Sequence, residues 1–403
     1  MHKVYALTQT YGIRVIKVCE MEILVLGCGN IGSVVAEDIG QNLSSAQITI
    51  ADTNEDRVKG VASRIGRDNV SWTKVDALNH DELASTLGKF DLAVGALPGV
   101  IGYRVCKAAI SAGKDIVDVS YMPEDVMTLH QDALEAEVSV LPDCGMSPGL
   151  GSILAGHAVS KLDRVESVHM INGGLPETPV PPLGYVITWS VNDLIDMYCR
   201  KVTIVKKGKT VEVEAMSGLE EIRFPGVGKL EAFYTDGLRT MLYTMKGVKD
   251  MWEKTLRYPG HVEKIKLLKT LGFFDAEPLD TENLNISPRQ VTAALFERKL
   301  KRRDIPDIVV MRVEVRGLRN GNRATYAYHV LDRYDKQHQV TAMARTTAYT
   351  ASVTAQLLAK KTIREKGVIP PEKLGMNKEF YSDYVQMMKK REVTIKESRD
   401  TAK

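Results

Sequence analysis

The glycine-rich turn Gly27–Gly32, with the sequence GCGNIG, has the residue types and spacing that point most directly to chemistry. Such a turn lets a pyrophosphate approach the backbone, because glycine has no side chain to block it. An apolar run at 23–26 precedes the turn, and a helical run through Val34, Val35 and Ile39 follows it. The N-terminal N–H groups of that helix would point at the phosphates. The predicted cofactor contacts of the turn are Gly27, Gly29, Asn30, Ile31 and Gly32.

Asp52 ends the next apolar strand, 47–52, and indicates which dinucleotide is bound. A carboxylate at this place accepts hydrogen bonds from the adenosine ribose hydroxyls. It would repel a 2′-phosphate, and the neighbouring Thr53 and Asn54 supply no arginine to receive one. The sequence therefore predicts NAD, with NADP the less favoured cofactor. Arg57 is the one nearby cation that could turn toward a phosphate.

Alternating strands and helices position these residues in a first domain. Further strands are predicted at 70–75, 92–96, 115–119 and 138–141, separated by helices near 82–87, 103–112 and 123–136. Six strands connected in this way predict a Rossmann doubly wound parallel sheet in the α/β class.

Ligands of such a sheet bind beyond the carboxyl ends of its strands. We therefore expect the adenosine half of the dinucleotide near Asp76 and Ala77, and the nicotinamide near the loops that begin at Ala96, Ser120 and Asp143. The predicted cofactor contacts outside the glycine turn are Asp52, Asp76, Ala77, Ala96, Leu97 and Gly145.

From residue 165 onward the pattern changes to longer strands and hairpins. They are predicted at 165–171, at 201–213 around Lys207-Gly208, and at 308–330 around Asn320-Gly321. Apolar and charged residues alternate in the last of these, as in a strand with one buried face. The sequence thus predicts a second, α+β domain with a mostly antiparallel sheet.

Two helices of the second half have clear signals. Ser287, Pro288 and Gln290 form the capping box and first turn of one helix. The other, 346–360, is alanine-rich and amphipathic, and we expect it to return to the nucleotide domain. The predicted division is an N-terminal extension at 1–20, a nucleotide domain at 21–150 with the returning segment 346–371, a catalytic and dimerisation domain at 151–345, and a charged, helical tail at 372–403. Residues 13–18 could add an edge strand, or the natural start could be Met21.

Composition limits the classes of function. A chain of 403 residues favours two domains, and 26% charged residues with a net charge of +3 give no reason to expect nucleic acid or a membrane surface as a partner. No apolar run is long enough for a membrane span, and the five cysteines show no metal-binding spacing. We expect a cytoplasmic protein without a metal.

Five motifs, in order along the chain, resemble those of the saccharopine dehydrogenase family. They are Gly27–Gly32, Asp143–Gly149, Gly173–Pro176, Thr255–His261 and Met343–Thr347. The resemblance covers Met21 to Pro371 and is closest to the lysine 6-dehydrogenase branch, whose motifs recur at 254–261 and 340–350. It implies NAD(P)-linked oxidation of the side-chain amine of lysine or a lysine derivative. Fold analogy adds a homodimer.

Two positions disagree about the substrate. Saccharopine reductases resemble this chain but have an acidic residue where Ser147 stands, which favours the lysine 6-dehydrogenase branch. Arg239, in contrast, falls where those reductases have an arginine suited to a substrate carboxylate. Lysine, saccharopine and a carboxynorspermidine-type secondary amine therefore stay open as substrates, and a catalytically inactive NAD-binding regulatory protein is the alternative of another class.

Oxidation of an amine requires a base that takes up the amine proton. The catalytic candidates are Asp143, Tyr121 and His261. Asp143 could instead cap its loop, and His261 could be a structural hydrogen-bonding residue. The buried-type Cys144 is not needed, because hydride transfer uses no nucleophile.

Arginine suits the substrate carboxylate because its planar fork binds two oxygens. Arg257 is the first candidate because it lies in a family motif, Arg239 is the second and Arg345 the third. The predicted substrate contacts are Ser120, Gly174, Arg239, Arg257 and Tyr258. The polar residues Tyr121, Asp143, Arg257 and His261 argue against the inactive alternative.

Overall fold

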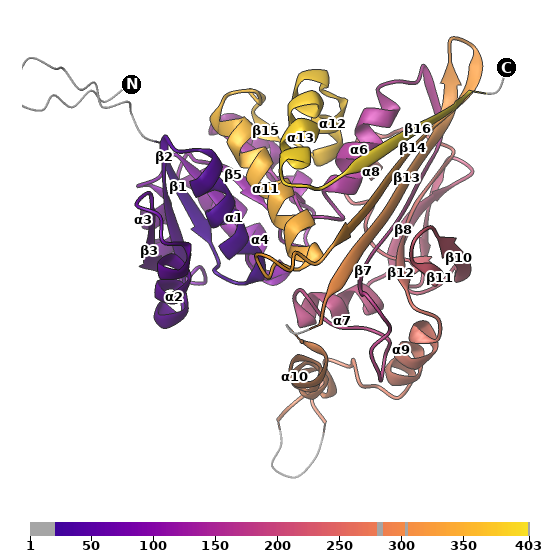
Figure 1. Cartoon of the computed structure of the whole chain (residues 1–403), viewed down its shortest axis with the longest axis horizontal. Coiled ribbons are helices and arrows are strands. Elements are labelled where there is room, and N and C mark those ends of the chain that lie inside the picture. The colour runs from indigo at the N-terminus through magenta and orange to yellow at the C-terminus, as the bar shows by residue number, and fades with distance from the viewer. Residues whose placement is uncertain (1–20, 280–284, 303–304, 402–403) are drawn as a thin grey trace, which may run out of the picture. The chain divides into compact units, whose positions relative to one another are not determined.

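The computed structural model describes residues 21–279, 285–302 and 305–401. Its contacts group the chain into two compact units, which are described separately below (Figure 1). The first comprises the chain up to Pro142 together with 351–369, and the second comprises 143–350 and 370–403. The possible edge strand at 13–18 lies outside the described residues.

A seven-stranded parallel sheet forms the centre of the first unit, in the order β15-β6-β5-β4-β1-β2-β3. Its strands are β1 (Met21–Leu26), β2 (Ala46–Asp52), β3 (Val70–Lys74), β4 (Leu92–Gly95), β5 (Asp115–Asp118), β6 (Ser139–Leu141) and β15 (Gly367–Val368). This order confirms the predicted Rossmann-type sheet. The seventh strand, β15, was missed because two residues give no periodic signal.

The helices of this unit connect its strands. They are α1 (Asn30–Asn42), α2 (Glu55–Ile65), α3 (His80–Leu87), α4 (Gly99–Ser111), the 3₁₀ turn Val126–Leu129 and α5 (His130–Glu135). Residues of α3, α4 and α5 share one hydrophobic core with the central strands. The single helix predicted at 123–136 is wrong in length. A 3₁₀ turn and a six-residue helix take its place.

The helix α11 (Ala342–Ala359) brings a distant part of the chain to α1. Asp38 of α1 is 7% exposed. Its carboxylate accepts hydrogen bonds from Ser352 Oγ at 2.5 Å and Gln356 Nε2 at 3.2 Å. Because both donors lie in the part of α11 that belongs to the first unit, these bonds fix that part of the helix against α1.

The second unit contains a nine-stranded mixed sheet, with the main order β10-β11-β12-β7-β13-β14-β16. Its strands are β7 (Arg164–Pro176), β8 (Val202–Lys206), β9 (Lys209–Val213), β10 (Glu220–Phe224), β11 (Gly228–Tyr234), β12 (Asp250–Arg257), β13 (Asp307–Arg319), β14 (Asn322–Arg333) and β16 (Ile395–Thr401). All pairs are antiparallel except β12 with β7. Both predicted hairpins are confirmed, and Asn320 and Gly321 have the positive φ angles that their turn requires.

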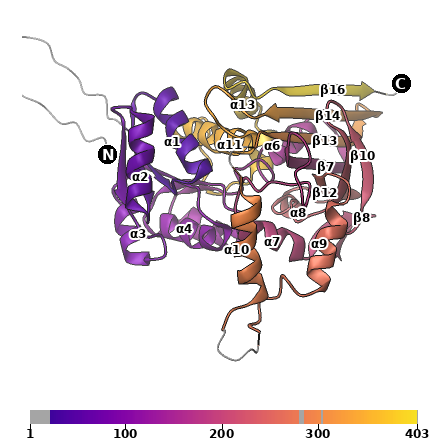
Figure 2. The same ribbon diagram turned by 60° about the horizontal axis from the view of Figure 1, so that its bottom comes forward.

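Helices accompany this sheet, and Figure 2 brings α7, α9 and α10 forward. The helices are α6 (Leu150–Val159), α7 (Val191–Cys199), α8 (Met241–Thr244), α9 (His261–Thr270), α10 (Pro288–Leu300), α12 (Pro371–Met376) and α13 (Lys378–Lys390). The capping box of Ser287 and Gln290 at the start of α10 is confirmed. The helical tail is only partly right, because α13 is followed by the strand β16, which pairs with β14.

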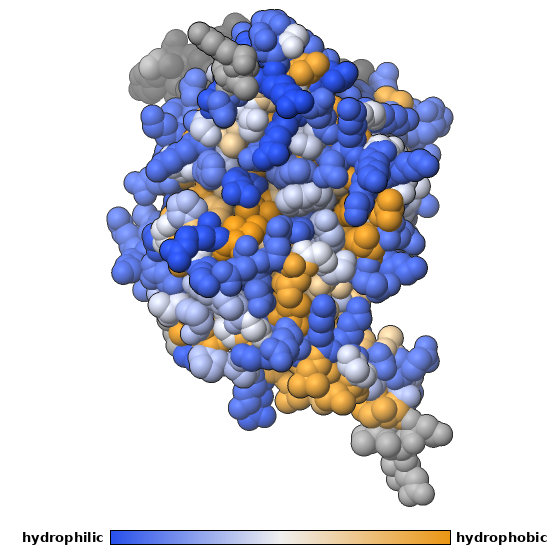
Figure 3. Space-filling view, turned by 90° about the vertical axis from the view of Figure 1, so that its right-hand side faces the viewer, coloured by the Kyte–Doolittle hydropathy of each residue, from blue (hydrophilic) through white to orange (hydrophobic). Residues whose placement is uncertain are grey.

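Exposed large apolar side chains gather on α9, α10 and the segment between them (Figure 3). They are Leu267, Leu271, Phe273, Leu279, Ile286, Val291 and Leu295. In the described parts of the chain, no helix is long and apolar enough to cross a membrane.

Candidate active site

The glycine turn after β1 has the shape of a phosphate cradle. A Cβ atom on Gly32 would lie 1.9 Å from the carbonyl oxygen of Gly27, and one on Gly27 would lie 2.4 Å from that of Ala96. These two positions therefore admit no side chain. Gly29, in contrast, is exposed and has open space beside it. Since α1 begins here with no acidic residue in its first turn and no side-chain cap, the residues present fit a pyrophosphate.

Asp52 is tied to the same turn. Its Oδ2 accepts a hydrogen bond from Cys28 N at 3.0 Å, and its Oδ1 accepts one from Asn54 N at 2.9 Å. Burial opposes ionisation of this carboxyl, but the two backbone hydrogen bonds, the Cys28 side chain and the charge of Arg57 together outweigh it and lower the pKa of Asp52. The side chain is therefore a half-buried anion beside the cradle. Arg57 is exposed and lies close enough to favour that charge.

The other carboxyl-end loops of the first unit hold the remaining predicted residues. Asp76 is exposed and accepts a hydrogen bond from Leu78 N at 2.9 Å. Ser120 is 2% exposed and donates its hydroxyl hydrogen to the carbonyl oxygen of Leu97 at 3.1 Å. The structure thus brings the Leu97 and Ser120 loops together, and Ser120 uses its hydrogen within the protein. Tyr121, next to it, is half-buried.

In the second unit, Asp143 and Arg239 form one buried ion pair. Arg239 Nε lies 3.0 Å from both carboxylate oxygens of Asp143, and the two side chains are 8% and 1% exposed. Both residues also have a left-handed backbone, with φ of 56° for Asp143 and 46° for Arg239. Strained backbone of this kind gathers at functional sites. A residue predicted as a base and one predicted to bind a carboxylate are therefore in direct contact with each other.

Arg257, at the end of β12, is a buried cation without a carboxylate partner among the described residues. Its side chain stacks on Tyr185, with 4.2 Å from Cζ to the ring centroid, and Nη1 donates to the carbonyl oxygen of Leu256 at 2.8 Å. The residue is 2% exposed, and Nε has no hydrogen-bond partner in the described structure. A buried guanidinium of this kind favours an anion as its ligand.

His261 begins α9 and is fully engaged. Its Nε2 lies 2.8 Å from Tyr198 Oη, and its Nδ1 lies 2.9 Å from the carbonyl oxygen of Leu183. Burial, aided by the charge of Arg257, lowers the pKa of His261 to about 3. This geometry favours the structural role over the catalytic one, because no ring nitrogen is left for a substrate.

Two more predicted substrate residues are engaged in packing. Tyr258 donates its hydroxyl hydrogen to the carbonyl oxygens of Pro176 and Glu177, at 3.0 and 3.2 Å. A Cβ atom on Gly174 would lie 2.3 Å from Met343 Cε. Gly145 closes the loop of Asp143, since its N–H donates to the carbonyl oxygen of Pro148 at 3.1 Å.

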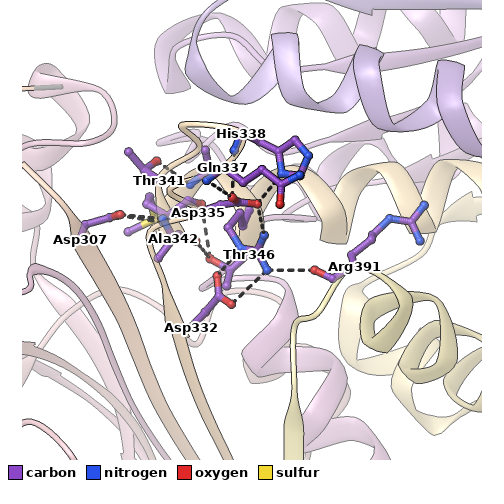
Figure 4. Close-up of polar contacts among 12 residues, drawn as sticks. Asp307, Asp332, Asp335, Gln337, His338, Thr341, Ala342, Thr346 and Arg391 are labelled. Atoms are coloured by element: carbon purple, nitrogen blue, oxygen red, sulfur yellow. Dashed lines mark hydrogen bonds and ion pairs between the residues drawn. The ribbon is translucent and has the colours of Figure 1, made fainter. Parts of the chain in front are cut away.

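Arg345, the third arginine candidate, contacts Asp332, Asp335 and Arg391. Figure 4 labels these three partners, which belong to one network of polar contacts. Its Nε donates to Asp332 at 2.9 Å, Nη1 to Asp335 at 3.1 Å, and Nη2 to the carbonyl oxygen of Arg391 at 2.9 Å. All three guanidinium nitrogens have partners within the protein, so this geometry favours a structural role for Arg345 over the predicted contact with a substrate carboxylate.

One buried acid was missed from the sequence. Glu253 of β12 is 3% exposed, and burial raises its pKa to about 7. Its carboxyl group contacts Asn172 of β7 and Thr235. The strand β12 has the sequence DMWEKTLR, and because it contains other charged residues, nothing in the sequence singled out this glutamate. No group of three metal-ligating side chains occurs among the residues described here.

Two family models match the chain. The saccharopine dehydrogenase NADP binding domain matches residues 23–141, and the saccharopine dehydrogenase C-terminal domain matches residues 145–393. The chain belongs to the saccharopine dehydrogenase family. The predicted resemblance is thereby confirmed for the family, and not for its lysine 6-dehydrogenase branch. The first model is described as binding NADP, so the matches support a nicotinamide dinucleotide and give no support to a preference for NAD.

Similar proteins cover the chain to different extents. Bovine mitochondrial alpha-aminoadipic semialdehyde synthase is 26% identical over 64% of this chain, which spans only 29% of that protein. Carboxyaminopropylagmatine dehydrogenase of Synechocystis is 20% identical over 88% of this chain and 92% of its own length. The apo structure of Saccharomyces cerevisiae saccharopine dehydrogenase (L-Glu forming) matches 94% of this chain and 100% of that one, with a TM-score of 0.76 and 19% identity. This last likeness confirms the fold.

Proposed function

We propose that the chain is an NAD(P)-dependent oxidoreductase acting on CH–NH or CH–NH₂ donors, and that it oxidises the side-chain amine of L-lysine. The observation that carries the proposal is Arg257, a buried guanidinium with an unpartnered Nε. Such a group suits the carboxylate of an amino acid. The membership of the saccharopine dehydrogenase family supports the redox class.

The cofactor would bind at the cradle of Gly27, Gly29 and Gly32, with Asp52 near the ribose. When bound, its nicotinamide ring would accept a hydride from the carbon that bears the amine. Asp52 supports NAD as the finer proposal, because its charge opposes a 2′-phosphate.

The chain's own residues would supply binding and proton transfer. Arg257 would hold a substrate carboxylate and so orient the amine-bearing carbon. Asp143, whose carboxyl oxygens lie 3.0 Å from Arg239 Nε, is our proposed acceptor of the amine proton, because both nitrogens of His261 are engaged within the protein. Tyr121 is the second candidate.

A secondary amine is the alternative substrate. The similarity to carboxyaminopropylagmatine dehydrogenase over nearly its whole length supports it, and so does Arg239, at a position that resembles the carboxylate-binding arginine of saccharopine reductases. A homodimer and a cytoplasmic location remain proposals, the first to be tested by analytical ultracentrifugation.

The deciding experiment offers NAD or NADP together with L-lysine, saccharopine or a carboxyalkyl polyamine, and follows the absorbance of the reduced nicotinamide. Reduction with lysine alone supports the main proposal, and reduction only with a secondary amine supports the alternative. If none of these amines reduces either cofactor, and no reduced cofactor is consumed in the reverse direction, the enzyme proposal fails.

A further inference from the structure

A chain of three polar side chains runs from the core of the second unit to the loop at 143–149. Asn172 Nδ2 donates to Glu253 Oε1 at 2.5 Å and to Ser147 Oγ at 2.9 Å. Glu253 and Asn172 are 3% and 4% exposed, whereas Ser147 is half-buried. These hydrogen bonds therefore connect a fully desolvated carboxyl group to the hydroxyl of Ser147. Of the three side chains, Ser147 is the one that a ligand can approach.

The direction of these hydrogen bonds fixes what Ser147 offers. The amide nitrogen of Asn172 has two hydrogens, and each has an acceptor here. Because Ser147 Oγ accepts one of them, its own hydrogen must point elsewhere. Among the described residues the structure gives that hydrogen no acceptor, so Ser147 presents an unused donor.

We propose that Ser147 donates a hydrogen bond to a carboxylate oxygen of the amino-acid substrate, and that Glu253 is the positioning residue that keeps Ser147 in this state through Asn172. The inference rests on the proposed function and deepens it, because it names a further residue of the amine site. Asp143 and Ser147 lie in the same short loop, which supports a shared role.

Ionised Glu253 accepts hydrogen bonds only, and so requires the nitrogen of Asn172 on its side. Protonated Glu253 can donate, which allows the Asn172 amide to turn over. The Asn172 oxygen would then accept from both Glu253 and Ser147, and Ser147 would lose its outward hydrogen. The second oxygen of Glu253 adapts to either state, because the Thr235 hydroxyl, 2.5 Å away, can donate or accept.

The surroundings of Glu253 place this change near neutral pH. Burial raises its pKa to about 7, the hydrogen bonds from Thr235 and Asn172 oppose the rise, Asp236 adds to it, and Arg257 opposes it. Asn172 on β7 and Thr235 after β11 are uncharged. Substrate affinity should therefore weaken as the pH falls through about 7.

The test measures the dissociation constants of L-lysine and saccharopine by calorimetry, with NAD present, between pH 6 and 8.5, next to initial rates. Ser147→Ala should raise the dissociation constant of the bound amino acid about tenfold at pH 8 and leave the KM for the nucleotide unchanged. Ser147→Thr keeps the hydroxyl and should restore binding. Glu253→Gln should remove the pH dependence of substrate affinity, and it should change nothing further when combined with Ser147→Ala. Glu221→Gln, on the exposed side of the sheet, is the matched control.

Three results would overturn the inference. The first is unchanged amino-acid binding in Ser147→Ala. The second is a Ser147→Ala protein in which only the KM for the nucleotide is raised. Ser147 would then donate its hydrogen bond to the carboxamide of the cofactor and not to the amino acid. The third is a Glu253→Gln protein with lower thermal stability but an unaltered pH profile, which means a structural role. If the wild-type chain binds these amino acids yet oxidises none of them, the proposed function fails. The dissociation constants measured by calorimetry still test the role of Ser147 in that case. If it binds none, both fail.

Discussion

Asp52 has two backbone N–H partners and still lies half-buried beside the phosphate cradle. We expect Asp52→Ala to weaken NAD about tenfold, because the ribose hydroxyls lose a charged acceptor. Affinity for NADP should fall less, since a repulsive charge disappears as well. The measurement is kcat/KM for each cofactor, with the exposed Asp56→Ala as the control. An unchanged ratio of the two values would remove Asp52 from its assigned role.

Arg257 can be tested against another buried arginine. Arg257→Lys should raise the substrate KM by tenfold or more and the NAD KM much less, because the planar fork is lost while the charge remains. Arg345→Lys should lower the thermal midpoint instead, since Arg345 holds Asp332 and Asp335. Equal effects of Arg257→Lys on both KM values would mean that Arg257 serves the structure alone.

For single residues, the sequence predicts sites whose members are close together in the chain, and it misses contacts between residues that are far apart in the chain. Gly27, Gly29 and Gly32 lie within six residues, and their pattern was enough to predict the cradle. The pairs Asp143–Arg239 and Asn172–Glu253 are separated by 96 and 81 residues. A single sequence does not reveal which distant side chains meet, so the pairing of Asp143 with Arg239 was not predicted, and Glu253 was overlooked.

The short helix α12 packs on α6 and α8 through a buried acid. Glu372 is fully buried, and its carboxyl oxygens accept from Thr244 Oγ1 at 2.6 Å and Thr240 Oγ1 at 3.0 Å. A Cβ atom on Gly156 of α6 would lie 2.0 Å from the Glu372 carbonyl oxygen, so this backbone has no room to move away. Burial raises the pKa of Glu372 from 4.5, the usual value of a glutamate, to about 7.

Glu372→Gln should therefore change how stability depends on pH. The folded protein holds this proton more tightly than the unfolded chain, so the contribution is full below pH of about 4.5 and is lost as the pH rises to about 7. Glutamine is neutral throughout and avoids that loss. Relative to wild type, the variant should gain up to about 3 kcal/mol of unfolding free energy between pH 5 and 8. Urea unfolding at both pH values measures this, and the exposed Glu379→Gln should show no such trend. An equal difference in unfolding free energy between the variant and wild type at pH 5 and at pH 8 would contradict the raised pKa of Glu372.

Elements were predictable where their pattern was long. The strands β13 and β14 alternate apolar and polar residues and meet at an Asn-Gly turn, which fixed both the hairpin and its register. The strand β16 does not alternate, because most of its described side chains are exposed, and its charged sequence was read as part of a helical tail. Its place in the sheet comes from pairing with β14. Such pairing leaves no mark on the strand's own composition.

The chain builds two cores, and only one of them contains the dinucleotide cradle. The first unit takes its strands from residues 21–141 and completes the sheet with β15, while the hydrogen bonds of Asp38 to Ser352 and Gln356 fix α11. The second unit has hydrophobic clusters of its own around Leu256 and Val202. Two cores of this size should unfold as two cooperative steps.

We therefore expect two calorimetric transitions, of which NADH raises one. A ligand that binds only the folded state stabilises it by RT ln(1 + [L]/Kd), about 2.7 kcal/mol at 100 times Kd. Removing two hydrogen-bond donors to Asp38 by the double change Ser352→Ala and Gln356→Leu should lower the NADH-sensitive transition and leave the other in place. Loss of hydrogen bonds to a buried carboxylate is costly, even though Asn42 Nδ2 still donates to Asp38 at 3.1 Å. Asp52→Ala should reduce the rise in transition temperature that NADH causes. In the absence of NADH, it should lower the temperature of the same transition less than the double change does. A single transition that moves as a whole with NADH would show that the continuous helix α11 couples the two units into one cooperative molecule.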